Sequence, residues 1–260
     1  MAAPAEEWYS NMPPITKIFA TSCVATTLAI HLDLVSPLAI YLNFDAVLAR
    51  GQWWRLVSNF FFFDYISLNF IFQMFFLIRH SRMLEEGSFH GRRGDFVFLW
   101  LWAATALLLL DASFYFAADY SDWIPSKILV LGPSLSFVIL YVWSRRNPSV
   151  MMSFFGVFTF TAPYLPWVIL GFGTFLGQSP LVDLLGIIVG HLYYFLEDVY
   201  PAQTGIRLLR TPRWFVSLVD RVSAAISGIA PPPPGNDRRA AWGAGVQLDP
   251  LGPGQDLHQE

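Results

Sequence analysis

The chain has few cysteines and few charged residues, and each shortage excludes a class of protein. Cys23 is the single cysteine among 260 residues, so neither an internal disulfide framework nor a zinc site built on several cysteines is possible. Only 13% of the residues are charged, whereas an ordinary soluble domain has roughly a quarter. A water-soluble enzyme of this size would lack the charge to cover its surface. The net charge is −3, and no basic domain is present that would indicate nucleic acid as a partner.

Apolar residues are correspondingly abundant. They make up 55% of the chain, and aromatic residues 17%, which excludes disorder over most of its length. A membrane-spanning helix needs about 20 apolar residues. Six candidate runs follow one another: 15–31, 56–78, 96–118, 128–143, 154–177 and 181–200. Because these runs are continuous and do not alternate with polar residues, they predict helices and not barrel strands. The predicted fold class is an all-α, polytopic membrane protein with six transmembrane helices.

The lysine and arginine positions predict the orientation of these helices. With six spans, thirteen of the sixteen basic residues fall on the side that holds both termini, and Arg50, Arg55 and Lys127 fall on the other. Loops rich in lysine and arginine remain in the cytosol. Both termini are therefore predicted to be cytosolic.

Composition divides the chain into four segments. Residues 1–14 form a short acidic N-terminal segment that lacks the features of a cleaved signal peptide. Residues 15–201 form the membrane domain. Residues 202–230 form a basic juxtamembrane segment with Trp and Phe side chains, which suits the membrane surface. Residues 231–260 begin with a run of prolines and predict a disordered tail.

Several predicted spans are short or contain ionisable side chains. The run 128–143 would give about 24 Å of helix, less than a hydrocarbon core of about 30 Å. Short spans thin the bilayer locally. His191 lies midway along the sixth run, so it must face protein or a water-filled cavity. Four acidic residues fit the water boundary at the ends of their runs: Asp64, Asp111, Asp183 and Glu197.

Two short motifs suggest structural roles. Trp54 and Arg55 close the long first loop, and an indole beside a guanidinium suits an anchor at headgroup depth. Gly186 and Gly190 form a GxxxG pattern immediately before His191, which allows the sixth span to approach a neighbour closely, with the fourth as the candidate. Glycine is common in membrane helices, so GxxxG alone is weakly specific.

Together these features resemble the rhomboid superfamily, and within it the Derlin family. The resemblance runs from Tyr9 to Pro201. Five phrases carry it: PPITK at 13–17, RMLEEGSF at 82–89, YVWSRRNP at 141–148, YLPW at 164–167 and DLLGIIVGHLYYFLEDVYP at 183–201. The resemblance implies a rhomboid-like fold of six helices.

Active rhomboids carry a serine at the start of the fourth span and a histidine in the sixth. Ser134 and His191 match those two places, and a serine paired with a histidine would make an activated nucleophile. An active intramembrane serine protease that uses this pair is therefore an open alternative.

Three departures from the protease pattern favour an inactive pseudoprotease. Leu135 replaces the second glycine of the serine motif, and Pro133 interrupts the helical hydrogen bonds beside the serine. Asn69 and Gln73 stand where active rhomboids carry the His and Asn that stabilise the oxyanion. Loss of one such donor costs about 10²–10³ in rate. Ser134 and His191 are then vestigial.

The tail contains a motif that resembles the SHP box, through which Derlins recruit an AAA ATPase of the valosin-containing-protein type. Its residues are Trp242, Gly243, Gly245, Val246 and Leu248. The usual Phe, Arg and final Gly are missing, which predicts weaker binding. A Gly-rich tail without a partner is the alternative. A flexible linker would hold the ATPase close to the membrane.

The Derlin resemblance implies a role in endoplasmic-reticulum-associated degradation and a link to the unfolded protein response. It implies retrotranslocation of misfolded proteins, with a membrane E3 ubiquitin ligase complex, the AAA ATPase and the lipid bilayer as partners. Whether the chain works alone or in a homo- or hetero-oligomer is left open by the sequence. Cofactors, metals and nucleic acid are not expected. Asn69, Gln73, Ser134 and His191 are expected to line a polar cavity in a locally thinned membrane. A small-molecule transporter is a third alternative, but the sequence shows no inverted repeat.

Overall fold

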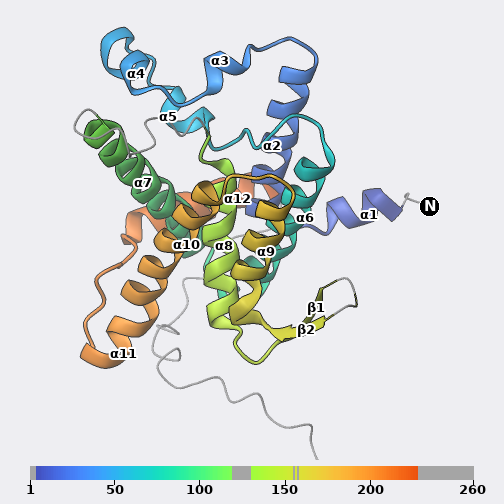
Figure 1. The fold of residues 1–260 in the computed structure, drawn as a ribbon. Helices are drawn as coiled ribbons and strands as arrows, with labels where there is room; N and C mark the ends of the chain where they lie inside the picture. Colours follow the sequence, from blue (N-terminus) through green and yellow to red (C-terminus); the bar gives the residue numbers. More distant parts are fainter. Residues whose placement is uncertain (1–3, 119–129, 155, 157, 228–260) are drawn as a thin grey trace, which may run out of the picture.

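The computed structural model describes residues 4–118, 130–154, 156 and 158–227. Within them the chain is a bundle of helices with one small β-hairpin (Figure 1). Three short helices lie at one end of the bundle, which we call the loop end: α3 (Pro37–Ile40), α4 (Phe44–Arg50) and α5 (Arg55–Ser58). The opposite end carries Arg82, Arg92, Arg145 and Arg146, and we call it the basic end.

The elements follow in this order: α1 (Pro4–Ser10), α2 (Pro14–His31), α3 (Pro37–Ile40), α4 (Phe44–Arg50), α5 (Arg55–Ser58), α6 (Leu68–Met83), the π-helical turn η1 (Leu84–Ser88), α7 (Arg93–Ala118), α8 (Gly132–Arg146), β1 (Met151–Phe154), β2 (Phe158–Thr161), the 3₁₀ turn η2 (Ala162–Tyr164), α9 (Leu165–Phe175), α10 (Pro180–Tyr194), the π-helical turn η3 (Phe195–Val199), α11 (Tyr200–Thr204) and α12 (Arg213–Ser227).

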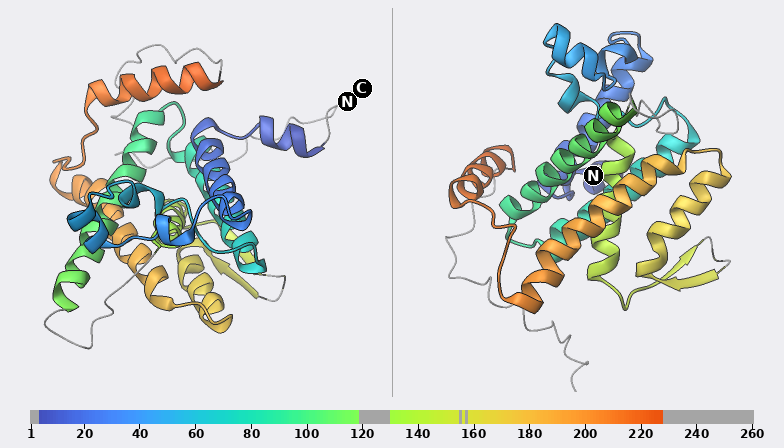
Figure 2. Two further views of the ribbon diagram at one scale, coloured as in Figure 1. Left: turned by 90° about the horizontal axis from the view of Figure 1, so that it is seen from above. Right: turned by 60° about the vertical axis from the view of Figure 1, so that its left-hand side comes forward.

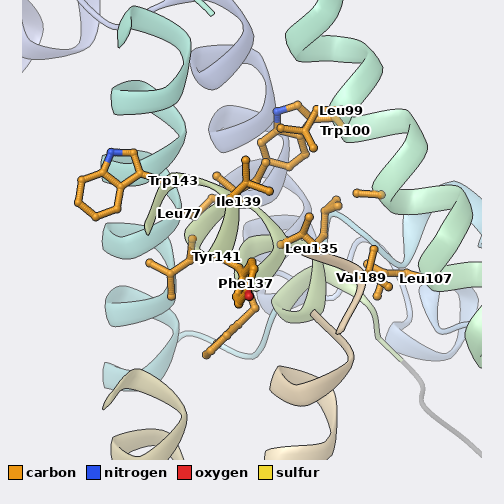
Figure 3. Close-up of a cluster of buried hydrophobic side chains, with 14 of the residues drawn as sticks. Leu77, Leu99, Trp100, Leu107, Leu135, Phe137, Ile139, Tyr141, Trp143 and Val189 are labelled. Atoms are coloured by element: carbon orange, nitrogen blue, oxygen red, sulfur yellow. The ribbon is translucent and has the colours of Figure 1, made fainter. Parts of the chain in front are cut away.

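Helix α8 is the centre of the molecule. It packs against α6, α7, α9 and α10, and most of its side chains are buried. Pro133 lies in its first turn, where a missing backbone N–H costs no helical hydrogen bond, so the prediction that Pro133 interrupts the helix beside Ser134 is wrong. Leu77 of α6, Leu99 of α7 and Val189 of α10 meet the α8 side chains in the central cluster (Figure 3). Burial of this cluster is the main stabilising term of the fold.

Among the described residues, two helical stretches are long and apolar enough to cross a membrane. They are Arg93–Ala117 and Pro180–Thr204, with 25 residues each, while the apolar stretch Ala162–Phe175 is shorter. Six spans would require α2, α6, α8 and α9 to cross as well, with 18, 16, 15 and 11 residues respectively.

Two of the predicted runs are wrong at their N-terminal ends. The run 56–78 begins with the last residues of the short helix α5 and then leaves helical structure until Leu68, where the Ser67 side chain accepts a hydrogen bond from Phe70 N and thereby caps α6. The run 154–177 becomes α-helical only at Leu165. Its first part belongs to the antiparallel hairpin β1–β2, which pairs Met151 with Thr161. The chain is therefore mostly, and not entirely, α-helical.

Helix α12 lies outside the bundle. It packs against α7 and, less extensively, α2. Figure 2 shows it running across the direction of the bundle helices at the edge of the molecule. It occupies most of the predicted basic segment 202–230, whereas the predicted tail 231–260 lies outside the described residues.

Candidate functional site

Helices α10 and α8 approach each other closely, and two glycines allow it. A Cβ atom built at Gly186 would lie 2.3 Å from the Ser134 carbonyl oxygen and 2.5 Å from Phe137 Cβ. A Cβ atom at Gly190 would lie 2.9 Å from Tyr141 Cβ. The GxxxG pattern thus faces α8, the fourth predicted span, with its backbone.

Ser134 lies inside this contact. Its side chain is fully buried, and its hydroxyl donates a 2.6 Å hydrogen bond to the Val182 carbonyl oxygen on the first turn of α10. The hydroxyl proton is therefore directed at backbone and not at a general base. In this geometry Ser134 acts as a bridge between two helices.

His191 lies at a different level of the same contact. Its Nδ1 is 2.7 Å from the Tyr141 hydroxyl, which also accepts a hydrogen bond of 2.9 Å from Arg145 Nε. The hydroxyl can donate its own proton to Nδ1, which fits an imidazole protonated at Nε2. Tyr141 is seven residues beyond Ser134, about 10 Å along α8. The structure thus gives Ser134 and His191 separate partners. His191 is exposed, and its ring makes an edge contact with the ring of Tyr141.

The other two predicted cavity residues also have different surroundings. Asn69 donates a 3.1 Å hydrogen bond to Asp64, in the turn before α6. Gln73 is half-buried, and its Oε1 has no hydrogen-bond partner in the described part of the chain. The structure does not bring Asn69, Gln73, Ser134 and His191 together as one polar lining.

A cavity of about 290 Å³ does lie nearby, between α6, the β-hairpin and the start of α9. Its lining is mainly aromatic and methionine side chains, among them Phe72, Phe76, Met152 and Phe160, and Arg79 provides a positive charge. None of the four predicted polar residues lines it. The sequence did not indicate this cavity, because part of the hairpin that closes it lies in the run 154–177, which predicted a helix.

At the loop end, Trp54 and Arg55 hold the first loop together. Trp54 Nε1 donates to the Ala39 carbonyl at 3.2 Å, and the Arg55 guanidinium donates to the carbonyls of Leu38 and Tyr41, the latter at 2.7 Å. These carbonyls are at the C-terminal end of α3, where a cation is favourable. Arg55 therefore binds loop backbone, whereas the sequence predicted lipid phosphate. The Trp54 side chain stays half exposed, at 56%, as an interfacial anchor requires.

At the basic end, an ion pair that the sequence did not indicate joins α8 to η3. Arg146 at the end of α8 donates two hydrogen bonds, of 3.0 and 3.1 Å, to Asp198 in η3. Its guanidinium also lies 4.8 Å from the centre of the Phe89 ring. Charges of opposite sign at the ends of the fourth and sixth predicted spans would have indicated this pair.

A second missed contact fixes the start of α2. The Glu85 carboxylate accepts hydrogen bonds from Ile15 N at 3.1 Å, Thr16 N at 2.8 Å and the Thr16 hydroxyl at 2.7 Å. Helix α2 has no side-chain cap of its own, so Glu85 satisfies amide groups that would otherwise have no helical partner. Burial raises the pKa of Glu85, although these donors act in the opposite direction.

The remaining predicted residues are the acidic side chains of the spans and the tail motif. Asp111 and Asp183 are buried at 5% and 8% exposure, so they are not the exposed boundary residues that the sequence analysis expected. Within the described residues, no group of three or more His, Cys, Asp or Glu side chains could hold a metal ion. The tail motif Trp242, Gly243, Gly245, Val246 and Leu248 lies outside the described residues.

Comparison with known proteins gives one consistent result. A model of the Der1-like family matches residues 12–213. A probable derlin-2 homolog of Dictyostelium discoideum is 50% identical over 220 residues, which are 85% of this chain and 85% of that protein. Derlin-2.1 of Zea mays is 45% identical over 253 residues, 96% of this chain and 99% of the maize protein. Derlin-2.2 of Arabidopsis thaliana is 47% identical over 222 residues, 84% and 89% of the two chains.

Proposed function

Because the chain belongs to the Der1-like family, we propose that it is a catalytically inactive, rhomboid-like component of endoplasmic-reticulum-associated degradation. Membership implies a function related to this degradation and a location in a membrane, that of the endoplasmic reticulum. The proposal adds six spans, cytosolic termini and a direct part in moving misfolded proteins to the cytosol.

The shortness of the helices around α8 carries this proposal. Helices α6, α8 and α9 have 16, 15 and 11 residues, which give about 24, 23 and 17 Å of length. A typical hydrocarbon core is about 30 Å thick. Lipid beside these helices must thin, or flanking polar groups must reach outward. A polar polypeptide would meet a lower barrier at such a place than in unperturbed bilayer.

The experiment lengthens α9 and measures degradation. In cells without their own Derlins, the chain should restore the rapid loss of a misfolded lumenal protein in a synthesis-block chase. A variant with one extra apolar turn in α9 should prolong that protein's half-life several-fold, because it brings α9 closer to the thickness of the bilayer and so reduces the thinning. A control insertion of the same residues between β1 and β2 should leave the half-life as short as with the original chain. Equal half-lives for all three chains would refute the thinning mechanism.

The separate partners of Ser134 and His191 support the assignment as a pseudoprotease over an active serine protease. A nucleophile needs its base within hydrogen-bond reach. Here the hydroxyl of Ser134 donates to Val182 and His191 contacts Tyr141. A fluorophosphonate probe should therefore label the purified protein no more than it labels the Ser134→Ala variant. Labelling that disappears in Ser134→Ala would establish the protease alternative.

The proposed partners are a membrane E3 ubiquitin ligase complex and an AAA ATPase of the valosin-containing-protein type, recruited by the tail. Affinity capture from detergent extracts, with the whole chain and with a chain ending at residue 230, tests the tail. The ATPase should be lost with the tail while the ligase complex is retained. Equal recovery of the ATPase would show that Trp242 to Leu248 has no recruiting role.

A further inference from the structure

Helix α12 presents a continuous apolar stripe on its outer face. Trp214, Leu218 and Val222 are spaced four residues apart, so they lie above one another along the helix. Their exposed fractions are 68%, 51% and 51%. Large apolar side chains are exposed on many elements, among them Phe175 and Leu109, but those of α12 form one row beside charged residues outside the bundle, and that row needs an explanation.

The inner face of α12 is fixed to the first residues of α7. A Cβ atom at Gly94 would lie 2.8 Å from Val216 Cα, so the two backbones are in close contact. Arg93 donates a 2.9 Å hydrogen bond to the buried Ser223 hydroxyl, and the rings of Phe98 and Phe215 are 6.5 Å apart. The direction of the outer stripe is thus set by rigid contacts and not by a flexible linker.

This attachment also sets the depth of α12. Arg93 and Gly94 begin α7, one of the two stretches long and apolar enough to cross a membrane. Figure 2 shows α12 lengthwise in the view from above and foreshortened in the other view, so it runs across the bundle direction. A helix that lies across a span, at the end of that span, lies in the plane of the leaflet.

The charges around the stripe are mainly positive. Arg213 and Arg221 flank it on the helix, and Arg207 and Arg210 lie in the segment that leads to it; all four are exposed. Asp220, the one acidic residue of α12, is partly buried on the inner side near Arg93. Arginines beside an apolar row with a tryptophan are typical of helices that bind anionic lipid surfaces.

We propose that α12 is an interfacial helix that binds the anionic phospholipids of the leaflet at the basic end. Trp214, Leu218 and Val222 insert at the boundary between headgroups and acyl chains. Arg213 and Arg221 contact the headgroup phosphates on one side. Through Gly94 and Ser223, the lipid surface then holds the end of α7 at a fixed depth.

The test measures the depth of two labels on α12. Cys23 is replaced by Ala, and an environment-sensitive fluorophore is attached to Leu218→Cys or, as a matched control one residue away, to Ser217→Cys on the polar flank. The chain is placed one copy per nanodisc. In discs with phosphatidylserine, the label at position 218 should emit at shorter wavelength and be quenched by iodide about threefold less than the label at 217.

Charge is tested separately. The double change Arg213→Gln and Arg221→Gln should bring the quenching at 218 in phosphatidylserine discs to the level of discs of phosphatidylcholine alone. The same loss of charge at Arg238 and Arg239, outside the described residues, should leave it unchanged. Equal quenching at 217 and 218 in every disc would refute the proposal. So would protection at 218 that appears only with two copies per disc, because a second chain would then cover the stripe.

Discussion

At the scale of single residues, the contact of α8 with α10 depends on a missing side chain. The nearest atom to a Cβ at Gly186 is a backbone oxygen, 2.3 Å away, which cannot move without shifting α8. Ser134 lies at the same place, and its hydroxyl bridges to Val182. Because α8 and α10 approach closely here, the Ser134 hydroxyl bonds to Val182 and not to His191.

A matched pair of alanine substitutions tests this contact. Gly186→Ala should destabilise the protein by about 1–3 kcal/mol, because the contact is already filled. Gly171→Ala, on α9, adds the same methyl group where nothing lies within 4 Å and should be neutral or stabilise by up to about 1 kcal/mol. Thermal unfolding in one detergent measures both. Equal melting temperatures would mean that α10 can move away from α8 at little cost.

At the scale of elements, α2 is joined to the end of α6 by one carboxylate. Glu85 in η1 accepts three hydrogen bonds from Ile15 and Thr16, although nearly seventy positions separate them. The adjacent Glu86 makes an exposed ion pair with Arg82 instead. Two neighbouring glutamates thus have very different surroundings.

Glu85→Ala should therefore destabilise the chain by about 1–3 kcal/mol, since buried amide groups lose their acceptor. Glu86→Ala should cost less than about 1 kcal/mol, as exposed ion pairs do. Unfolding measurements give the two values, and hydrogen exchange at the first turn of α2 gives a local readout. If exchange there is the same in both variants, α2 does not depend on Glu85.

At the scale of the whole molecule, helices of unequal length surround α8. Helix α7 has 26 residues, about 39 Å, whereas α9 has 11, about 17 Å. A long helix can tilt to fit the bilayer, but a short one cannot extend. If α9 crosses the bilayer, as we propose, the bundle as a whole should favour a membrane thinner than average.

The stability of the reconstituted protein should follow this mismatch. Its melting temperature should be higher in dimyristoyl than in dieicosenoyl phosphatidylcholine, because less lipid deformation is needed around α9. The variant with an extra apolar turn in α9 should shift the preference toward the thicker bilayer. No dependence on acyl length in either chain would mean that the short helices do not deform lipid.

The sequence by itself determined a helical chain rich in apolar residues, the approximate places of its long helices and the GxxxG face of α10. These features depend on local composition and spacing, which a single chain displays. It did not determine the hairpin β1–β2, because Phe and Thr alternate there within a run that is apolar enough for a helix. It also did not reveal the capping of α6 by Ser67, which delays that helix to Leu68.

Only the tertiary structure decided which side chains meet. In the folded chain Ser134 bonds to Val182, His191 to Tyr141, Arg55 to the backbone of its own loop and Glu85 to the start of α2. Each of these is a contact of 14 or more positions in sequence separation, and its partner is set by the angle and depth at which helices pack. Residue type says what a side chain can bind, whereas packing decides which of several possible partners lies within 3 Å.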